Sequence, residues 1–551
     1  MKLLFHVFLL LVVSFWSVRA LFIPGYFPMH DDTQVSRVIV MGKALLDGQF
    51  PVRLVDDLGY GFGYPLYNFY GPLPYYFGGT LYALGVTPIT ATKLMFGMGI
   101  IAAGLTMFFL GRRLFGATGG LLAAALFVYA PYHAVDIYVR GAVGEYWAIA
   151  WLPLVVAGVL FICRQPKRHW PVIIGGMGLA LVILSHTILG FITIILLGIG
   201  LALYWLVRFF TGSFRFPLFT LHLKLILLGL GLSAFFWIPA ISEMKFTNVA
   251  SQVSETADFH DHFVCLSQLW DSPWGYGGSA RGCLDGVSFK LGKLAIALMF
   301  ISLIGWFINR KKSAWRSFPL ILVGTGVSVF FLLPISQHVW EFMPQFSYVQ
   351  YPWRFLSFVI VGVSVMGAYV VLLVSRKIPR IVIVATIILL LLWTNNKLFQ
   401  PHFTYPIQST QLEDIDDLRL RVSKISDEYL PVDFVKPIFR EEVAQDVVSG
   451  ISIDKIERQV EKSQYIKFFV TNATTSVLKL NRVYFPGWHY YLNEKEVTPQ
   501  IVDGIPYLAI PEGRFAVELK WLDTPVRSVA NVVSLITVGI LLYVYGRKTI
   551  T

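Results

Sequence analysis

Two adjacent carboxylates, Asp31 and Asp32, come soon after the first long apolar run of the sequence and just before a segment with helical periodicity. A carboxylate can accept the proton of an attacking hydroxyl, so either residue is a candidate catalytic base. Two neighbouring carboxylates can also hold a divalent cation, such as Mg²⁺ or Mn²⁺, against a phosphate group. The alternative is structural, because Asp is a favoured N-cap residue and a helix is expected over 33–47.

Two arginines and two further polar residues are candidates for binding a phosphorylated substrate. Arg140 and Arg354 each stand at the expected outer end of an apolar run, and a guanidinium group offers phosphate a fork of donors. The alternative for both arginines is ordinary contact with the membrane interface. Glu145 and His186 occupy similar positions, where the alternative to substrate binding is a buried hydrogen bond.

Aromatic residues form two groups that could contact a sugar. The first lies in the Tyr-, Gly- and Pro-rich stretch 60–76, whose candidate substrate-binding residues are Tyr64, Asn68 and Tyr70. In the second group, Trp274 is the candidate, and it is followed by glycines. Aromatic rings can stack on sugar faces, but the same residues also anchor loops at a membrane interface.

The cysteines and one His- and acid-rich segment give two further signals. Of three cysteines, Cys265 and Cys283 share one expected outer loop, where they either form a disulfide or remain free thiols. The His- and acid-rich segment has metal-ligand side chains, but their spacing matches no standard metal site. Its members are Glu255, Asp258, His260, Asp261 and His262.

The elements that must position these residues are membrane spans. Of 551 residues, 56% are hydrophobic and only 14% are charged, which is too apolar for a water-soluble fold. The apolar residues come in runs of about twenty, the length of a helix that crosses a bilayer. The first run could instead be a signal peptide cleaved near Ala20. We expect about twelve transmembrane helices, near 3–22, 94–111, 114–135, 145–162, 171–187, 188–207, 223–241, 294–308, 317–334, 355–374, 380–396 and 528–545.

Charge asymmetry orients these spans. If Met1 is cytoplasmic, the expected inner segments carry Lys and Arg but no Asp or Glu, as the positive-inside rule requires. Both termini are then cytoplasmic, and the loops 23–93 and 243–293 and the region 398–526 lie outside. The net charge of +12 therefore reflects topology and contact with anionic lipids, and it does not indicate a nucleic-acid partner.

The outer loop 23–93 is expected to begin with an amphipathic helix. Val35, Val38 and Ile39 recur at helical spacing, and Gly48 should end the helix. An amphipathic helix that directly follows a span should lie along the membrane surface. Asp31 and Asp32 would then be held close to the lipid headgroups.

The chain divides into three parts: a transmembrane domain over 1–397, an extracytoplasmic domain over 398–526, and a final span with a cytoplasmic tail over 527–551. In 515–521 apolar and polar residues alternate, which predicts a strand of an antiparallel β domain. A polar run, Asn493 to Glu496, predicts a turn. Further strands are expected at 464–471, 475–480, 487–492 and 505–510.

Seven motifs are spread over most of the chain. They are Gly48-Gln49-Phe50-Pro51 through Tyr76, Arg140-Gly141 with Glu145, His262-Phe263-Val264, Trp274-Gly275-Tyr276-Gly277, Asp285 through Phe289, Gln350 through Phe355, and Tyr484 through Trp488. The first six resemble the bacterial membrane family labelled 6-pyruvoyl-tetrahydropterin-synthase-related, and the last resembles the outer β domain of YfhO-like proteins. Soluble pterin synthases hold zinc with a histidine triad, and no comparable set stands out here, so we assign no pterin chemistry.

The position of the Asp pair carries a second resemblance. Two Asp residues in a long outer loop after the first span are similar to the signature of GT-C glycosyltransferases, which take sugars from polyprenyl-phosphate carriers. The fold expected from this resemblance is an α-helical polytopic, GT-C-like membrane domain with an outer antiparallel β domain. Its expected place is the bacterial plasma membrane.

The leading functional hypothesis is a glycosyltransferase that moves a sugar from a polyprenyl-phosphate donor to a glycan, lipid or protein acceptor of the cell envelope. Asp31 or Asp32 would act as base, and Arg354 and Arg140 would bind the phosphate. The alternatives are a lipid or polysaccharide transporter and a non-catalytic scaffold. A coupled transporter usually needs ionisable groups near the bilayer midplane, and none is evident at mid-span.

Overall fold

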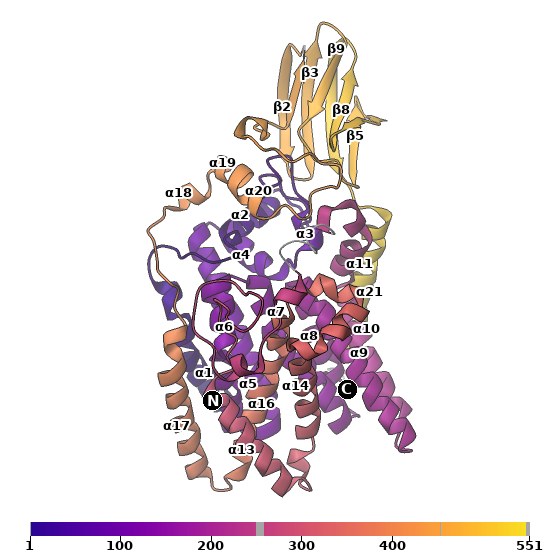
Figure 1. Cartoon of the computed structure of the whole chain (residues 1–551). Helices are drawn as coiled ribbons and strands as arrows, with labels where there is room; N and C mark the ends of the chain where they lie inside the picture. The colour runs from indigo at the N-terminus through magenta and orange to yellow at the C-terminus, as the bar shows by residue number, and fades with distance from the viewer. Residues whose placement is uncertain (1, 250–257, 452, 547–551) are drawn as a thin grey trace.

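The computed structural model describes residues 2–249, 258–451 and 453–546, and it combines a long helical bundle with a pair of β-sheets at one end (Figure 1). Among these residues, eight helical segments are long and apolar enough to cross a membrane, or nine if a bent pair counts as one span. The eight are Leu3–Phe22 (in α1, Lys2–Val18, and η1, Arg19–Phe22), Pro88–Val128 (α5), Val143–Arg164 (α7), Thr187–Phe210 (α9), Ser313–Leu332 (with α14, Phe318–Leu332), Pro352–Leu373 (η9, Pro352–Phe355; α16, Leu356–Ala368; and η10, Tyr369–Leu373), Lys377–Leu398 (with α17, Lys377–Asn395) and Pro525–Val544 (in α21, Pro525–Gly546). Two shorter apolar helices, α8 (Trp170–Ser185) and α13 (Lys293–Asn309), complete the bundle.

Helix α5 contains two of the expected spans. They are separated at Gly116, whose φ of 78° and ψ of 179° interrupt the helical geometry. The predicted end of the second span, at 135, is wrong, because the helix stops at Val128. Pro131 has no N–H to donate and disfavours helical geometry in the residue before it, and Ala130 accordingly has a ψ of 128°.

The predicted span 223–241 is also wrong as a single straight helix. It is divided between α10 (Phe216–Leu232) and α11 (Ala234–Glu243), and the helical pair is bent by 72°. Ser534 of α21 supports the bend, since its hydroxyl donates to the Gly231 carbonyl at 2.9 Å and accepts from the Phe235 N–H at 2.9 Å. A side chain of the last helix thus satisfies backbone groups that a straight helix would bond internally.

Helix α2 (Gln34–Leu46) follows the Asp pair as expected and ends before Gly48, whose φ is +85°. The helix is buried on nearly every side by other parts of the protein. Its expected position along the membrane surface stays a prediction. It packs against α4 (Leu73–Ala83), where a Cβ on Gly42 would lie 2.8 Å from the Gly79 carbonyl oxygen. The two glycines therefore permit a helix crossing too close for larger residues.

The β domain contains two antiparallel sheets, with strand orders β1-β4-β8-β7 and β2-β3-β9-β5-β6. Every expected strand is confirmed, and the turn after β5 lies at Asn493 and Glu494, both with positive φ. The strands are β1 (Val448–Ile451), β2 (Lys455–Lys462), β3 (Tyr465–Asn472), β4 (Ser476–Leu480), β5 (Trp488–Leu492), β6 (Lys495–Val497), β7 (Gln500–Val502), β8 (Ile505–Ile510) and β9 (Gly513–Trp521). Alternate side chains of both sheets, such as those of Leu478, Leu480 and Leu519, form their core.

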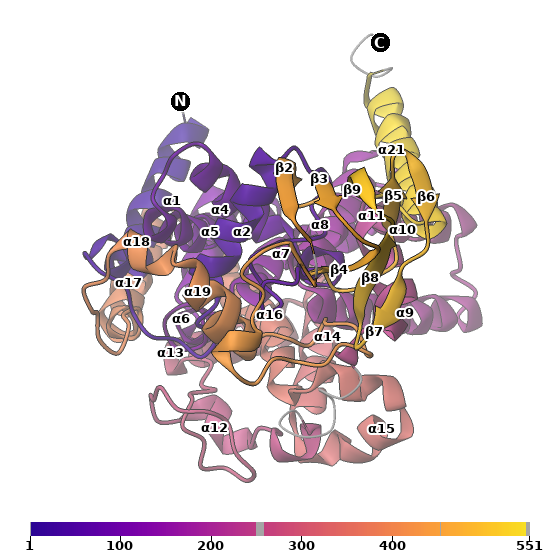
Figure 2. The same ribbon diagram turned by 90° about the horizontal axis from the view of Figure 1, so that it is seen from above.

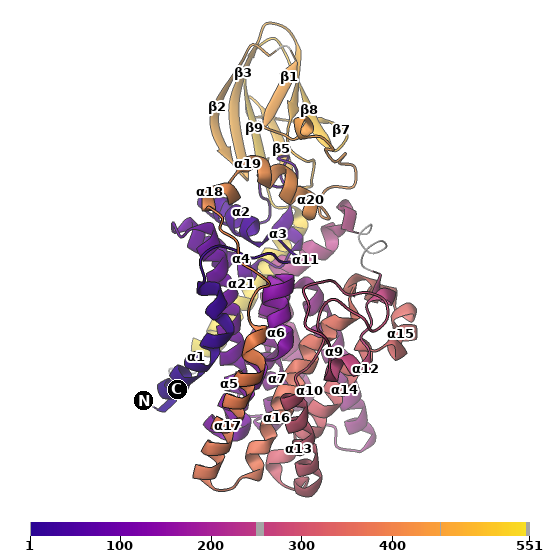
Figure 3. The same cartoon turned by 60° about the vertical axis from the view of Figure 1, so that its left-hand side comes forward.

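A linker over 399–447 joins the bundle to the sheets. It includes α18 (Ser409–Leu412), α19 (Ile415–Asp417), η12 (Leu418–Val422) and α20 (Ser423–Ile425), which lie between the sheets and the bundle (Figures 1 and 3). The view from above shows the sheets over only part of the bundle, with α12 (Leu266–Trp270) and α15 (Gln337–Phe342) at the uncovered side (Figure 2).

The linker contacts the other segments that we expected to lie outside. The backbone of Tyr26 pairs with that of Tyr405, and Thr247 forms an isolated bridge with Pro431. The His30 ring also lies 3.1 Å from the Tyr276 carbonyl oxygen. The three expected outer segments are therefore in mutual contact.

A buried ionic cluster, here called the Glu243 clamp, fixes the last helix. Glu243 of α11 accepts from Nε and Nη2 of Arg527 in α21 at 3.0 and 2.9 Å. Its carboxylate also accepts from the Thr524 hydroxyl and from the Asn68 amide, both at 2.8 Å. Because Arg527 Nη2 donates to the Pro486 carbonyl as well, the clamp ties α21 to both α11 and the β domain.

Candidate active site

Four of the sequence-predicted residues come together at one end of the bundle. Arg140 ends the short helical turn η2 (Asp136–Arg140), and Glu145 lies in the first turn of α7. His186 lies between α8 and α9, and Arg354 lies in η9 (Pro352–Phe355). Electrostatic interactions link Glu145 to each of the other three. We call this group, together with Asp136, the Glu145 cluster.

Glu145 is the centre of the cluster and is fully buried. Its Oε2 lies 2.9 Å from Arg140 Nη1 and 3.7 Å from Arg354 Nε. Its Oε1 accepts a hydrogen bond from the Tyr132 hydroxyl and a longer one, at 3.5 Å, from Ser357. A single carboxylate thus sets the positions of two guanidinium groups that come from distant parts of the chain.

Asp136 adds a second carboxylate that the sequence reading missed. Its Oδ1 accepts a hydrogen bond from Arg140 Nη1 at 2.6 Å. The two residues are four positions apart in the sequence, and this spacing could have indicated the pair. Burial, followed by the charge of Glu145, raises the pKa of Asp136 well above its usual range. The Arg140 guanidinium lies over the Trp353 ring at 4.2 Å, so the motif residue before Arg354 also holds this group.

Three polar atoms of the cluster are buried without a hydrogen-bond partner among the described residues. They are Asp136 Oδ2, Glu145 Oε2 and Arg354 Nε. Glu145 Oε2 and Arg354 Nε remain in ion pairs, whereas Asp136 Oδ2 has neither a hydrogen bond nor an ion pair among the described residues. Buried polar atoms without hydrogen bonds are rare in proteins and costly, so each calls for an explanation such as a ligand that bonds to it. The cluster therefore has the chemistry of a site that receives a polar ligand.

Asp31 and Asp32 adjoin this cluster through the backbone. The N–H of Asp31 donates to the Arg140 carbonyl at 2.9 Å, and the N–H of His30 donates to the Val139 carbonyl at 3.1 Å. The Gln34 side chain donates to the Gly141 carbonyl at 2.8 Å, so the start of α2 is fixed to the same turn. The charge of Asp31 also interacts with Arg140.

The carboxylates of the Asp pair do not cap α2. The N-cap residue is Thr33, and no side-chain cap bond is present, so the N-cap interpretation is wrong. Asp32 Oδ2 instead lies 3.9 Å from Arg421 Nη1 of the linker. Burial raises the pKa of Asp32, an effect that Arg421 opposes, and a raised pKa makes a carboxylate a stronger base.

The remaining predicted residues lie outside the Glu145 cluster. Tyr64 is buried and its hydroxyl accepts from the Tyr429 N–H at 3.1 Å, whereas Asn68 belongs to the Glu243 clamp. The Tyr70 ring packs under the Arg37 guanidinium at 4.1 Å. Trp274 lies 5.6 Å from the Lys290 ammonium in the loop that contains the cysteines.

That loop is closed by a disulfide between Cys265 and Cys283, whose Cα atoms are 5.6 Å apart. Glu255 lies outside the described residues. Asp258 and His260 contact each other, and His260 also contacts Glu341, but no group of three or more His, Cys, Asp or Glu side chains in the described part of the chain is arranged to hold a metal ion.

Residues 67–402, more than half of the chain, match the model of the 6-pyruvoyl-tetrahydropterin synthase related domain, a membrane protein. The chain belongs to this family, and the predicted resemblance is confirmed. A protein of Lactococcus lactis subsp. cremoris, described as uncharacterized, is 26% identical over 217 residues. That match spans 38% of this chain and only 35% of the relative.

Three solved structures are similar to this chain, each at low sequence identity. The oligosaccharyltransferase of Archaeoglobus fulgidus has a TM-score of 0.45 at 12% identity and covers 80% of this chain and 60% of its own. The arabinofuranosyltransferase AftD from Mycobacteria has a TM-score of 0.45 at 16% identity, covering 74% and 27%. ArnT from Cupriavidus metallidurans, solved with undecaprenyl phosphate, has a TM-score of 0.32 at 13% identity, covering 67% and 78%. Scores below 0.5 do not establish a shared activity.

Proposed function

We propose that the protein is a GT-C-type glycosyltransferase that transfers one sugar from a polyprenyl-phosphate donor to an acceptor outside the cytoplasmic membrane. One observation carries the proposal: side chains from four separate segments meet in the Glu145 cluster, and Asp31 adjoins this cluster through its backbone bond to Arg140 and its charge. A cation that can bind phosphate is then near a carboxylate that can accept a proton, which is the pair of functions that glycosyl transfer requires.

The reaction assigns a role to each group. The acceptor hydroxyl oxygen attacks the anomeric carbon while Asp31 or Asp32 takes its proton, and the bond from that carbon to the phosphate oxygen breaks. Polyprenyl phosphate leaves with the bonding electrons, and Arg354 and Arg140 stabilise its negative charge. Glu145 positions both guanidinium groups, and the single displacement inverts the anomeric configuration.

A divalent cation is a further part of the proposal. Mg²⁺ is often bound by one or two carboxylates together with substrate phosphate oxygens, so Asp31 and Asp32 would suffice on the protein side. Such a cation would neutralise charge on the leaving phosphate. Loss of turnover in EDTA with recovery on Mg²⁺ or Mn²⁺ would support this part, and full activity in EDTA would end it.

The decisive experiment incubates the purified full chain with a panel of polyprenyl-phosphate sugars and measures free polyprenyl phosphate. The enzyme releases it from at least one donor, whereas a transporter or a non-catalytic scaffold releases none. Asp31→Asn and Asp32→Asn are compared with Glu512→Gln, which changes an exposed carboxylate of the β domain. Release by both Asp variants at the unaltered rate would refute the base assignment.

The proposed orientation places the Asp pair, the Glu145 cluster and the β domain outside the cell, with both termini in the cytoplasm. The predicted inner segments are basic and free of acids, which supports this arrangement. Single cysteines in 398–408 should react with an impermeant thiol reagent on intact cells, and cysteines in 310–316 should not. Labelling of 310–316 from outside would reverse the orientation.

A further inference from the structure

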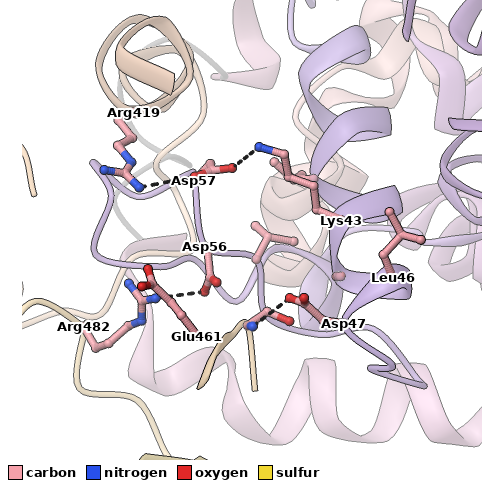
Figure 4. A pocket seen from close by; sticks show the side chains of 12 residues that line it. Lys43, Leu46, Asp47, Asp56, Asp57, Arg419, Glu461 and Arg482 are labelled. Atoms are coloured by element: carbon pink, nitrogen blue, oxygen red, sulfur yellow. Dashed lines mark hydrogen bonds and ion pairs between the residues drawn. The ribbon is translucent and has the colours of Figure 1, made fainter. Parts of the chain in front are cut away.

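A polar cavity of about 360 Å³ lies between the C-terminal half of α2, the extended segment 55–57 and the β domain (Figure 4). Its carboxylates are Asp47, Asp56, Asp57 and Glu461, and they come from both sides of the cavity. It lies apart from the Glu145 cluster, and none of the predicted site residues lines it.

Three cations face these carboxylates across the cavity. Lys43 Nζ lies 2.6 Å from Asp57 Oδ2, and Arg419 Nη2 lies 3.4 Å from Oδ1 of the same residue. Arg482 Nη2 lies 3.4 Å from Asp56 Oδ1. The linker residue Arg419 and the β-domain residue Arg482 thus both point toward the 55–57 segment, as Figure 4 shows.

These ion pairs leave hydrogen-bonding capacity unused. Asp56 Oδ1, Arg419 Nε and Arg482 Nε are buried without a hydrogen-bond partner in the described part of the chain. The Arg482 side chain is only 4% exposed, so its free N–H cannot be satisfied by bulk water. A contact that only held two domains together would gain stability by pairing these atoms.

We infer that this cavity binds one hydroxyl-rich sugar residue of the acceptor, an inference that rests on the proposed glycosyl transfer. Sugar hydroxyls both donate and accept hydrogen bonds, and the cavity offers carboxylate acceptors beside guanidinium and ammonium donors. Val40, Ala44 and Val55 supply an apolar side for the C–H face of the ring. The cavity volume lies at the lower end of the range for small-molecule sites, which is about 300–1,000 Å³.

The charges of the residues that line the cavity indicate which class of ligand it can bind. Four carboxylates against three cations make a phosphate or carboxylate ligand unfavourable, because an added anion would face a surplus of negative charge. A neutral sugar, or one that bears an amine, fits this balance.

The position on α2 defines which part of the acceptor is bound. The Asp pair precedes α2, and the cavity lies along its last two turns, so the two ends of this 13-residue helix are about 20 Å apart at 1.5 Å per residue. The cavity therefore contacts a sugar residue well removed from the reacting hydroxyl. The natural acceptor is then an oligosaccharide or polymer, and remote contacts supply binding energy for transfer.

The test measures binding directly, so it does not depend on turnover. The purified full chain in detergent is titrated by calorimetry with tetramers of mannose, of N-acetylglucosamine and of glucosamine, and with inorganic phosphate. We expect at least one tetramer to bind and phosphate to leave the cavity empty. Asp56→Asn and Glu461→Gln keep side-chain size and should weaken tetramer binding about tenfold or more, the value of one or two hydrogen bonds to a charged group.

Glu512→Gln is the matched control and should bind like the unaltered chain, and thermal unfolding checks that every variant folds. Binding of no tetramer, or binding that the cavity variants leave unchanged, would overturn the inference and make the cavity a water-filled interdomain contact. Polyprenyl phosphate release without tetramer binding would reject this site and keep the proposed function. Tetramer binding without polyprenyl phosphate release from any donor would keep this sugar-binding site and reject the proposed transfer reaction.

Discussion

The Glu145 cluster and the Glu243 clamp are built from the same residue types but use them differently. In the clamp, both carboxylate oxygens of Glu243 accept hydrogen bonds, and Arg527 donates two of these bonds, although Arg527 Nη1 itself has no hydrogen-bond partner among the described residues. In the cluster, Glu145 Oε2 lies close to Arg140 and Arg354, yet none of these contacts has hydrogen-bond geometry. Both glutamates are almost fully buried, so exposure does not explain the difference.

The difference teaches how a structural ion pair can be told from a candidate functional one. A buried carboxylate whose two oxygens both accept hydrogen bonds mainly holds elements together, and removing it costs stability. A buried carboxylate with an oxygen that accepts no hydrogen bond can still receive one from a ligand. We therefore expect substitutions in the clamp to change folding and those at the Glu145 cluster and its Asp pair to change turnover.

The largest expected effect is on turnover in Asp31→Asn or Asp32→Asn. Asn keeps the size of Asp and removes its basicity, so the variant at the catalytic base should lose about 10²- to 10⁴-fold in kcat. The melting temperature should stay near that of the unaltered chain, because neither side chain caps α2. Single-turnover rates and thermal unfolding on the same preparations check both statements. If the variants instead unfold, the Asp pair has a structural role like that of the Glu243 clamp.

The next effect concerns the disulfide beside the Asp pair. Cys265 and Cys283 are 18 residues apart, and closing such a loop contributes about 3 kcal/mol in the chain-entropy treatment. Because this loop contacts His30 through Tyr276, the double Cys→Ser variant should lower activity while the clamp holds α21 in place. Non-reducing peptide mapping should find the linked peptides in the unaltered chain. If both cysteines are alkylated as free thiols, the disulfide is absent and cannot hold the loop against His30.

A matched pair of substitutions sharpens the comparison further. Arg354→Lys and Arg527→Lys both keep the charge and lose the guanidinium fork. Arg527→Lys cannot reproduce two bonds to Glu243, so it should lower the free energy of unfolding by about 1.5–3 kcal/mol. Arg354→Lys should raise the donor KM or lower kcat by about tenfold with a smaller change in stability. Equal losses of stability in both variants would mean that the cluster and the clamp do not differ in the way proposed.

The smallest effect lies in the β domain, where Glu518 accepts from Lys467 and Lys520 at 2.8 and 2.9 Å. These hydrogen bonds, first that of Lys467, lower the pKa of Glu518 from 4.5 to about 2. A lowered folded-state pKa adds stability that is present above pH 4.5 and lost as the pH falls toward 2.

Glu518→Gln should therefore lower the melting temperature at pH 7, by at most about 2–4 °C for a partly exposed pair. It should have almost no effect near pH 2, where the unaltered carboxyl is itself becoming protonated. Calorimetric melts of both proteins across this range provide the measurement. A difference that persists unchanged at pH 2 would mean that the contribution of Glu518 is not ionic.

Local sequence patterns predicted most elements, because spans, strands and turns depend on nearby residues. The alternation in 515–521 placed β9 correctly. The polar run Asn493–Glu496 placed the turn after β5 in part, because Lys495 and Glu496 already belong to β6. The bend between α10 and α11 could not be predicted, because it depends on Ser534 about 300 residues later. The burial of α2 likewise depends on α4 and on the linker, which cover the face that appeared polar.

The candidate site was predicted in part for the same reason. Arg140, Glu145, His186 and Arg354 were identified by residue type and by position at span ends, but their meeting depends on how the spans pack. Asp136 carried a local signal in its i,i+4 spacing to Arg140 and was missed. The cavity could not be found from sequence, since Asp56 and Arg482 are brought together only by docking of the β domain.

The long-range contacts of α2 and the turn after it also determine when this region can fold during synthesis. Arg37 of α2 bonds to Ser426, and Gln49, three residues after the end of α2, bonds to Ser463, across separations of 389 and 414 residues. At a synthesis rate of about 5–20 residues per second, α2 waits roughly 20–80 seconds before the ribosome has produced these partners. Throughout that interval the Asp pair is already present, but the linker and sheets that hold its helix are not. The contacts that hold α2 in place can therefore form only late in synthesis, after residues 426 and 463 have been made.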